Sequence, residues 1–308
     1  MIDDPHQLAR LLNGTVLAGR AIESVMIEGS DDRALAIRSL PGNQLVEWQT
    51  ARELLRLTGR WPVIASLADL DVHTLFSRSP YAWGFDVDTS QARIVTRSEV
   101  LDTRDALAAR RVLHRHVSVA SLVDREVGAT ELAIGRRPSD AELTEELGVG
   151  ITPRPWVRKE RSPTIGEVDA WFNEWAGQDH PRLASLDPGY LDGFVPYNGW
   201  LVFLPTASWW NTPAYLSFFG AEGPGGAECL IAVLRSWARR YEAELVAHHG
   251  TWLQFHVGSP PRSISDALVL AREQHIMAVD TLSRAGVPVW YHARVLVGRP
   301  TWILHERP

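Results

Sequence analysis

The chain has 308 residues, of which 45% are hydrophobic and 22% are charged, and its formal net charge is −6. This length exceeds the ~100–200 residues of a typical domain, so two domains or one large composite domain are expected, and the negative charge disfavours general binding of nucleic acids. The single cysteine, Cys229, excludes an internal disulfide and a cysteine-rich zinc site, and the absence of an apolar run near ~18 residues or of a signal-like start makes a cytoplasmic location the expectation.

Residues 1–95 are predicted to form a small mixed α/β unit. In chain order the pattern indicates a short helix at 6–12, a hairpin of strands 22–28 and 34–38, a helix from Leu45 that ends before Gly59, and a buried strand at 61–65. Pro62 lies where the chain enters this buried strand, a position at which a proline, which cannot donate a ladder hydrogen bond, is tolerated.

Residues 96–163 are predicted to be a helical connector followed by a Pro/Arg-rich linker. Charged residues are interleaved among Ala, Leu and Val from Ser98 to about Glu126, which favours helix, and Ser139 or Asp140 can cap a further short helix that Gly148 closes. The basic residues within 104–161 raise nucleic-acid binding as a hypothesis, but a solvated helix face explains them better. Nucleic acid is therefore an unlikely partner.

Residues 164–308 are predicted to form a C-terminal α+β domain. The pattern indicates helices at 164–177, 227–241 and 264–279 and strands at 199–205, 244–248, 251–257 and 301–305, whereas 290–297 fits a strand or a helix. The helices are amphipathic, and the stretch at 199–205 is apolar on both faces. The expected fold class is α+β, with a mixed or antiparallel sheet flanked by amphipathic helices.

Six residues are candidates for binding a ligand. Aromatic rings can stack on a ligand, and amide, imidazole and carboxyl groups can hydrogen-bond it. Three of the six precede a mobile-looking glycine-rich stretch at 220–226, and two others share the outward face of the strand at 251–257. The last lies on the polar side of the helix at 264–279, where Asp266 and Arg272 are also expected. The candidates are Trp209, Trp210, Asn211, Trp252, His256 and Glu273.

Two other kinds of site are weighed and not favoured. The glycines of 220–226 could cradle a phosphate, but no Gly-Lys-Ser/Thr or G-x-G-x-x-G pattern follows. His248, His249 and His256 could bind zinc, but neighbouring strand residues face opposite sides and the spacing matches no familiar zinc motif. We therefore assign no metal, no cofactor and no catalytic residue.

The C-terminal third resembles a bacterial family catalogued as domain of unknown function 4253. Residues 232–245 are similar to its AVLRYWxERYGAE run, and residues 271–275 carry its AxEQ signature as Ala-Arg-Glu-Gln-His. Pro260-Pro261, Asp280 and a terminal strand with Trp302 follow the same pattern, and residues 58–63 are similar to an upstream TGxWPV segment. The chain departs from the family at Ile276-Met277, where the family has Tyr-Cys. The resemblance covers residues ~197–306 and implies no chemistry.

The function expected from these observations is that of a binding or interaction module, including the toxin-immunity type. Its partner is an unidentified protein or a small ligand, and no membrane partner is expected. The alternative is a hydrolase-like enzyme with a cleft lined by the Trp and His candidates and with Glu273 as the acid or base.

Overall fold

The computed structural model describes residues 1–28, 31–65, 72–76, 119–147, 163–177, 188–192, 199–216, 218 and 226–306. The chain divides into two compact units, the first of Met1–Val112, Gly193–Ser259 and Thr301–Pro308 and the second of Leu113–Asp192 and Pro260–Pro300. Each unit is built from stretches that are separated in the sequence, whereas the three segments expected above are consecutive. The boundaries of those three segments stay a prediction. No helix of the described residues is long and apolar enough to cross a membrane.

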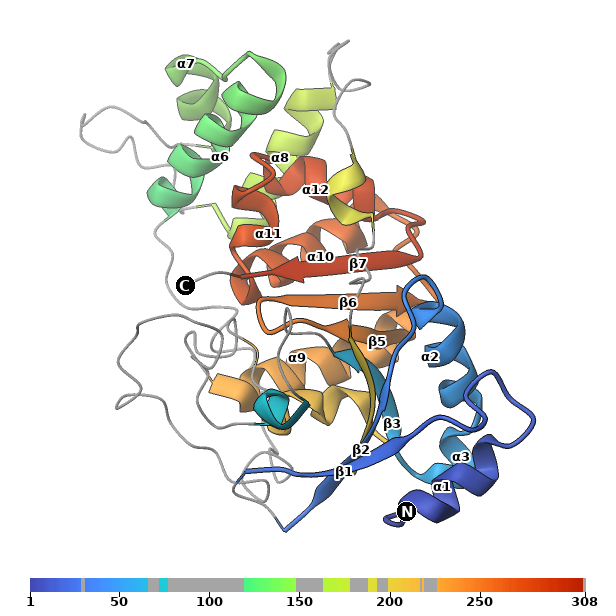
Figure 1. The fold of residues 1–308 in the computed structure, drawn as a ribbon. Coiled ribbons are helices and arrows are strands. Elements are labelled where there is room, and N and C mark those ends of the chain that lie inside the picture. Colours follow the sequence, from blue (N-terminus) through green and yellow to red (C-terminus); the bar gives the residue numbers. More distant parts are fainter. Residues whose placement is uncertain are drawn as a thin grey trace. The chain divides into compact units, whose positions relative to one another are not determined.

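The first unit contains one sheet of seven strands, in the order β1-β2-β4-β3-β5-β6-β7 (Figure 1). Every neighbouring pair is antiparallel except β3 and β5, which are parallel. The sheet is therefore mixed, and the predicted α+β class is confirmed. The strands are β1 Ile22–Met26, β2 Arg33–Arg38, β3 Trp61–Ala65, β4 Trp200–Leu204, β5 Ala243–His248, β6 Trp252–Val257 and β7 Thr301–His305.

Two helices, α2 (Gln44–Glu53) and α9 (Gly226–Tyr241), pack on opposite faces of this sheet. Arg52 of α2 hydrogen-bonds Glu244 of β5, whereas Trp237 of α9 packs edge-on against Phe255 of β6 at a centroid distance of 6.1 Å. Phe255 pairs with Leu245, the neighbour of Glu244, and successive strand residues point to opposite faces. The remaining described helical segments of this unit are α1 Pro5–Leu12, α3 Leu55–Thr58, η1 Val72–Phe76 and η6 Trp209–Ala214.

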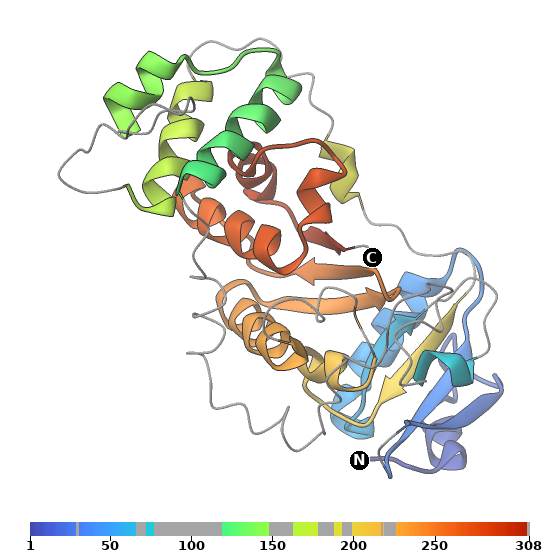
Figure 2. The same cartoon turned by 90° about the vertical axis from the view of Figure 1, so that its left-hand side faces the viewer.

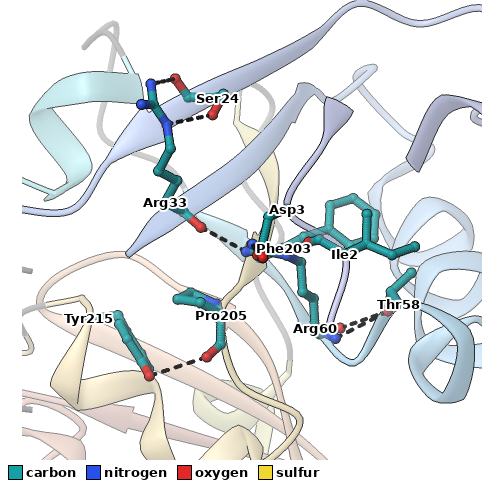
Figure 3. A network of polar contacts seen from close by, with 9 residues as sticks. All are labelled: Ile2, Asp3, Ser24, Arg33, Thr58, Arg60, Phe203, Pro205 and Tyr215. Carbon is teal, nitrogen blue, oxygen red and sulfur yellow. Dashed lines mark hydrogen bonds and ion pairs between the residues drawn. The ribbon is translucent and has the colours of Figure 1, made fainter. Parts of the chain in front are cut away.

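Arg60 joins the N-terminus to the middle of the sheet. Gly59, at φ 67°, ends α3 in the left-handed conformation and leads the chain into Arg60, whose side chain is buried. The Arg60 guanidinium donates to the carbonyl oxygens of Arg33 at 2.7 Å and Phe203 at 3.2 Å. It also donates to the carbonyl oxygen of Ile2 and to the carboxylate of Asp3 (Figure 3). One side chain thus ties together the chain start, β2 and β4.

The buried strand that the chain enters through Pro62 is β3, and all five of its residues are buried. β3 lies between β4 and β5 in the sheet, and Pro62 is paired with Phe203. The register with β5 involves only Ile64 and Ala65, so the missing N–H of Pro62 falls outside that ladder. The carbonyl of Pro62 accepts a hydrogen bond from Trp48 Nε1 at 3.0 Å. A central strand tolerates the proline because the paired part of its ladder with β5 begins only at Ile64.

The described part of the second unit is helical. Its main helices are α6 (Val119–Ile134), α8 (Ile165–Gly177), α10 (Ile264–Met277) and α12 (Val289–Leu296), and Figures 1 and 2 show α10 and α12 side by side. Between α6 and α8 lie α7 (Asp140–Glu142) and a π-helical turn (Leu143–Leu147); η5 (Pro188–Leu191) and α11 (Asp280–Ser283) complete the unit. The segment 290–297, undecided from sequence, is a helix, and the first part of the helix expected from Ser98 lies outside the described residues.

Candidate functional site

The first turn of helix α2 buries polar side chains and exposes aliphatic ones, the reverse of a solvated helix. Gln44 and Glu47 are buried, whereas Leu45 is 46% exposed and Val46 is 50% exposed. Amphipathic helices normally bury their aliphatic residues and expose their carboxylates. The outward side of the first turn of α2 is therefore apolar.

The polar residue Glu47 faces inward because it closes the preceding loop. Its Oε1 lies 3.0 Å from Arg20 Nη1 and accepts the backbone N–H of Leu40 at 3.2 Å. The carbonyl of Leu40 in turn accepts the N–H of Asn43 at 3.1 Å. These bonds hold Leu40, which is 48% exposed, beside the first turn of α2. We call Leu40, Leu45 and Val46 the α2 surface.

The sheet side of α2 is anchored independently of the α2 surface. Trp48 lies 6.3 Å from Trp61 between ring centroids, and Arg52 lies 5.0 Å above the Trp61 ring. Arg52 Nε donates to both carboxylate oxygens of Glu244 at 3.0 Å. Because these contacts hold the helix on the sheet, substitution of Leu45 or Val46 leaves its attachment intact.

Three of the six sequence candidates lie in η6. Trp209 is buried and packs against Phe255 of β6, with ring centroids 5.8 Å apart, and against Trp210 at 6.1 Å. The Asn211 amide donates to Thr206 Oγ1 at 3.3 Å. These contacts place η6 on the α9 side of β6.

Two further candidates lie on the other side of β6. Trp252 and His256 are separated from Phe255 by an odd number of strand positions, so their side chains point away from η6. The ring of Trp252 lies 4.1 Å from that of His305, and His256 is exposed opposite Glu244. The structure thus brings Trp252 and His256 to one face and Trp209 to the opposite face, rather than all of them into one cleft.

The histidines weighed as zinc ligands do not converge. His248 is paired with Leu253, on the α9 side of β6, where its ring lies 6.3 Å from that of Phe218. His256 points to the other side. Burial lowers the pKa of His248 to about 3, and Nδ1 of that ring accepts the backbone N–H of Gly250 at 3.2 Å.

The sixth candidate, Glu273, lies on α10 in the second unit, next to a buried polar cluster that the sequence did not predict. Arg272 was expected on the polar side of α10, and this is wrong: it is 9% exposed, and its Nε donates to Asp169 Oδ2 of α8 at 3.0 Å. A second nitrogen of Arg272, Nη2, also donates to Asp169 and lies 3.7 Å from Oε1 of Glu126, on α6. Because Asp169 lies 103 residues away, the sequence around Arg272 does not indicate this pairing.

A second chain of polar contacts in the same unit runs through His292 of α12. Its Nδ1 lies 2.7 Å from the Tyr190 hydroxyl and its Nε2 lies 2.7 Å from Gln274 Oε1. Because Gln274 Oε1 is an acceptor, Nε2 carries the proton and the Tyr190 hydroxyl donates to Nδ1. Burial lowers the pKa of His292 to about 3, so the ring is neutral at pH 7.

These buried histidines predict a loss of stability in acid. Burial, then Arg125, Arg272 and His292, lowers the pKa of His275 to about 3 as well. A histidine with a folded-state pKa below its unfolded value near ~6.5 contributes stability above that pH and loses it as the pH falls. We expect His292→Gln to reduce the pH slope of the free energy of unfolding by up to about 1.4 kcal/mol per pH unit between about pH 6.5 and 4.5.

Urea denaturation at several pH values measures this slope. Tyr190→Phe is the matched control, because it removes the hydrogen bond to His292 but keeps the buried ring, and it should retain the wild-type slope. An unchanged slope in His292→Gln would show that His292 has the same pKa in the folded and unfolded protein and would contradict the lowered pKa.

The region from β4 to β7 also carries the residues that resemble a known family. Residues 200–305 match the model of the family described as Domain of unknown function (DUF4253). The match spans α9, α10 and α12 as well as four strands, so the DUF4253 region contributes to both units. It includes Arg272, Gln274 and His292 but neither the α2 surface nor Arg60. No curated protein and no solved structure matches the chain.

Proposed function

We propose that the protein is a protein-binding module that contacts its partner through the α2 surface. The observation that supports this proposal is the first turn of α2, which buries Glu47 and exposes Leu45 and Val46. Isolated exposed aliphatic residues are common and need no explanation. Here three of them adjoin one helix turn while the neighbouring carboxylate faces inward, and clustered apolar exposure marks interaction sites.

The internal packing of α2 supports the same proposal. Trp48, Arg52 and Glu47 already hold the helix and its preceding loop, so the α2 surface adds nothing to that anchorage. Exposed aliphatic side chains lower the solubility of a protein, and a bound partner removes this effect by covering them. The hydrolase alternative has weaker support, because Trp209 and the pair Trp252 and His256 point to opposite faces of β6.

Site-specific photo-crosslinking tests this proposal. A photoreactive amino acid in place of Val46 should give a discrete adduct with a partner protein in cells that express the chain, and Leu45→Glu should reduce its yield at least tenfold because a carboxylate would be desolvated in the contact. The matched control places the same probe at Leu132, an aliphatic residue of the second unit that is 74% exposed. Equal adducts at both positions, or none at Val46, would reject the α2 surface as the binding site.

A further inference from the structure

Helix α10 buries three polar side chains that each have one nitrogen without a hydrogen-bond partner among the described residues. These atoms are Nη1 of Arg272, Nε2 of Gln274 and Nδ1 of His275. Arg272 is 9% exposed, His275 is 6% exposed and Gln274 is fully buried. Roughly 90% or more of the buried polar groups in folded proteins have a partner. Three such atoms within one turn of one helix therefore indicate a site at which a further molecule supplies the partner.

The unpartnered atoms of this unit are all of one chemical kind. Among the described residues of the second unit, the buried side-chain atoms without a partner are these three nitrogens and Nε of Arg299. Arginine and amide nitrogens only donate, and a neutral histidine nitrogen can donate. In the first unit, by contrast, such atoms include the acceptors Glu47 Oε2 and Gln254 Oε1. The described second unit thus has a surplus of buried donors, which a ligand rich in acceptors satisfies.

Two of the three side chains share one side of α10. Arg272 and His275 are three positions apart, a spacing that brings Cβ atoms on a helix to about 5–6 Å. Nε and Nη2 of Arg272 donate to Asp169 of α8, which leaves Nη1 available. Gln274 lies toward α12, where its Oε1 is 2.7 Å from Nε2 of His292. Arg272 and His275 are therefore the pair at which one small ligand meets two donors.

The charges around this pair favour a ligand with a single negative charge. Arg125, which is exposed on α6, is an electrostatic neighbour of both Arg272 and His275. The acidic neighbours are Asp169, which is ion-paired with Arg272, and Glu126. Burial raises the pKa of Glu126 to about 7, so this carboxyl is only partly ionised near neutral pH. The two arginines are consequently not fully balanced by the two acids.

We propose that Arg272 and His275 form a binding site for a small monocarboxylate. One carboxylate oxygen accepts from Nη1 of Arg272, and the other accepts from Nδ1 of His275, with the ring in its Nδ1–H tautomer. A carboxylate brings two acceptor oxygens, one charge and no donor, whereas a phosphate dianion brings a second charge close to Asp169 and Glu126. The site is independent of the α2 surface, since its residues all lie in the second unit.

NMR titration of the full-length protein with acetate at constant ionic strength tests this site. The Nε–Hε resonance of Arg272 and the ring nitrogen resonances of His275 should shift saturably with one common dissociation constant of about 1–5 mM. Acetamide has the size of acetate but is neutral and brings donors of its own, so it should give no saturable shift. Chloride should give none either, because it cannot bridge the two donors.

The variant His275→Leu separates a binding role from a structural one. It should bind acetate at least about tenfold more weakly, whereas His275→Gln, which keeps a donor, should stay within about threefold of the wild type. Without acetate, His275→Leu should unfold at no lower denaturant concentration than the wild type, because an apolar side chain leaves no buried donor unpartnered. His256→Leu, at an exposed histidine of the first unit, is the matched control and should keep the wild-type affinity.

Equal shifts with acetate and acetamide, or saturation only above about 50 mM acetate, would overturn the proposal. A folded His275→Leu variant with wild-type affinity would overturn it as well. Tighter binding of inorganic phosphate than of acetate would contradict the assignment of the site to a carboxylate.

Discussion

Arg60→Met should destabilise the first unit by at least about 3 kcal/mol, because the methionine leaves the carbonyl oxygens of Ile2, Arg33 and Phe203 without their donor. Each buried carbonyl that loses its hydrogen bond costs about 1–3 kcal/mol. The free energy of unfolding from chemical denaturation measures the loss.

Asp3→Asn separates the carbonyl contacts of Arg60 from its ion pair. The Asp3 side chain is 74% exposed, and exposed ion pairs contribute only about 0–1 kcal/mol. We therefore expect Asp3→Asn to cost less than about 1 kcal/mol. If Arg60→Met costs no more than Asp3→Asn, the guanidinium does not hold the chain start, β2 and β4 together.

Asp169→Asn should destabilise the second unit by about 3–5 kcal/mol, because it removes the carboxylate that holds the buried Arg272. Replacing both members with apolar residues, Asp169→Leu with Arg272→Met, should recover most of the loss, since a buried ion pair and a well-packed apolar pair are often of similar stability. Thermal or chemical unfolding of Asp169→Leu, of Arg272→Met and of the double variant completes the cycle. Strictly additive losses would show that the two side chains do not stabilise each other.

The strands and helices with regular hydrophobic patterns are those that the sequence predicted well. The alternation along 251–257 predicted β6, and the spacing of Leu230, Leu234, Trp237 and Tyr241 predicted the buried side of α9. The buried residues of these elements pack against other apolar side chains, so hydrophobic spacing alone identifies them. Local pattern was sufficient because each element has one apolar face and one sheet to cover.

The polar contacts were not predictable, because their partners are distant in the chain. Glu47 turns inward to meet Arg20, 27 residues earlier, and Glu126 meets Val289, 163 residues later. Helical periodicity placed Arg272 on the outer face of its helix, since it assumes that charged residues are solvated. A charged residue that has a buried partner is itself buried, and the residues next to it in the sequence do not indicate this.

The sixth candidate, Glu273, and the η6 residues remain predictions as ligand contacts. Trp252 and His256 share one face of β6 but lie four strand positions apart, about 13 Å at 3.4 Å per residue, so only an extended ligand contacts both. Trp209, by contrast, already packs against Phe255 and Trp210, which makes it a core residue of the α9 side. The aromatic side chains suggested these residues as ligand contacts, but only the strand register shows that they lie on opposite faces of β6.

The binding affinity of the double variant Leu45→Glu/Val46→Glu for the partner captured at position 46 tests the proposed function most directly. If the α2 surface is the binding site, the dissociation constant rises at least about 30-fold, as expected when two central apolar contacts are lost, while the free energy of unfolding stays within about 1 kcal/mol of the wild type. An unchanged dissociation constant in a folded double variant would contradict the account.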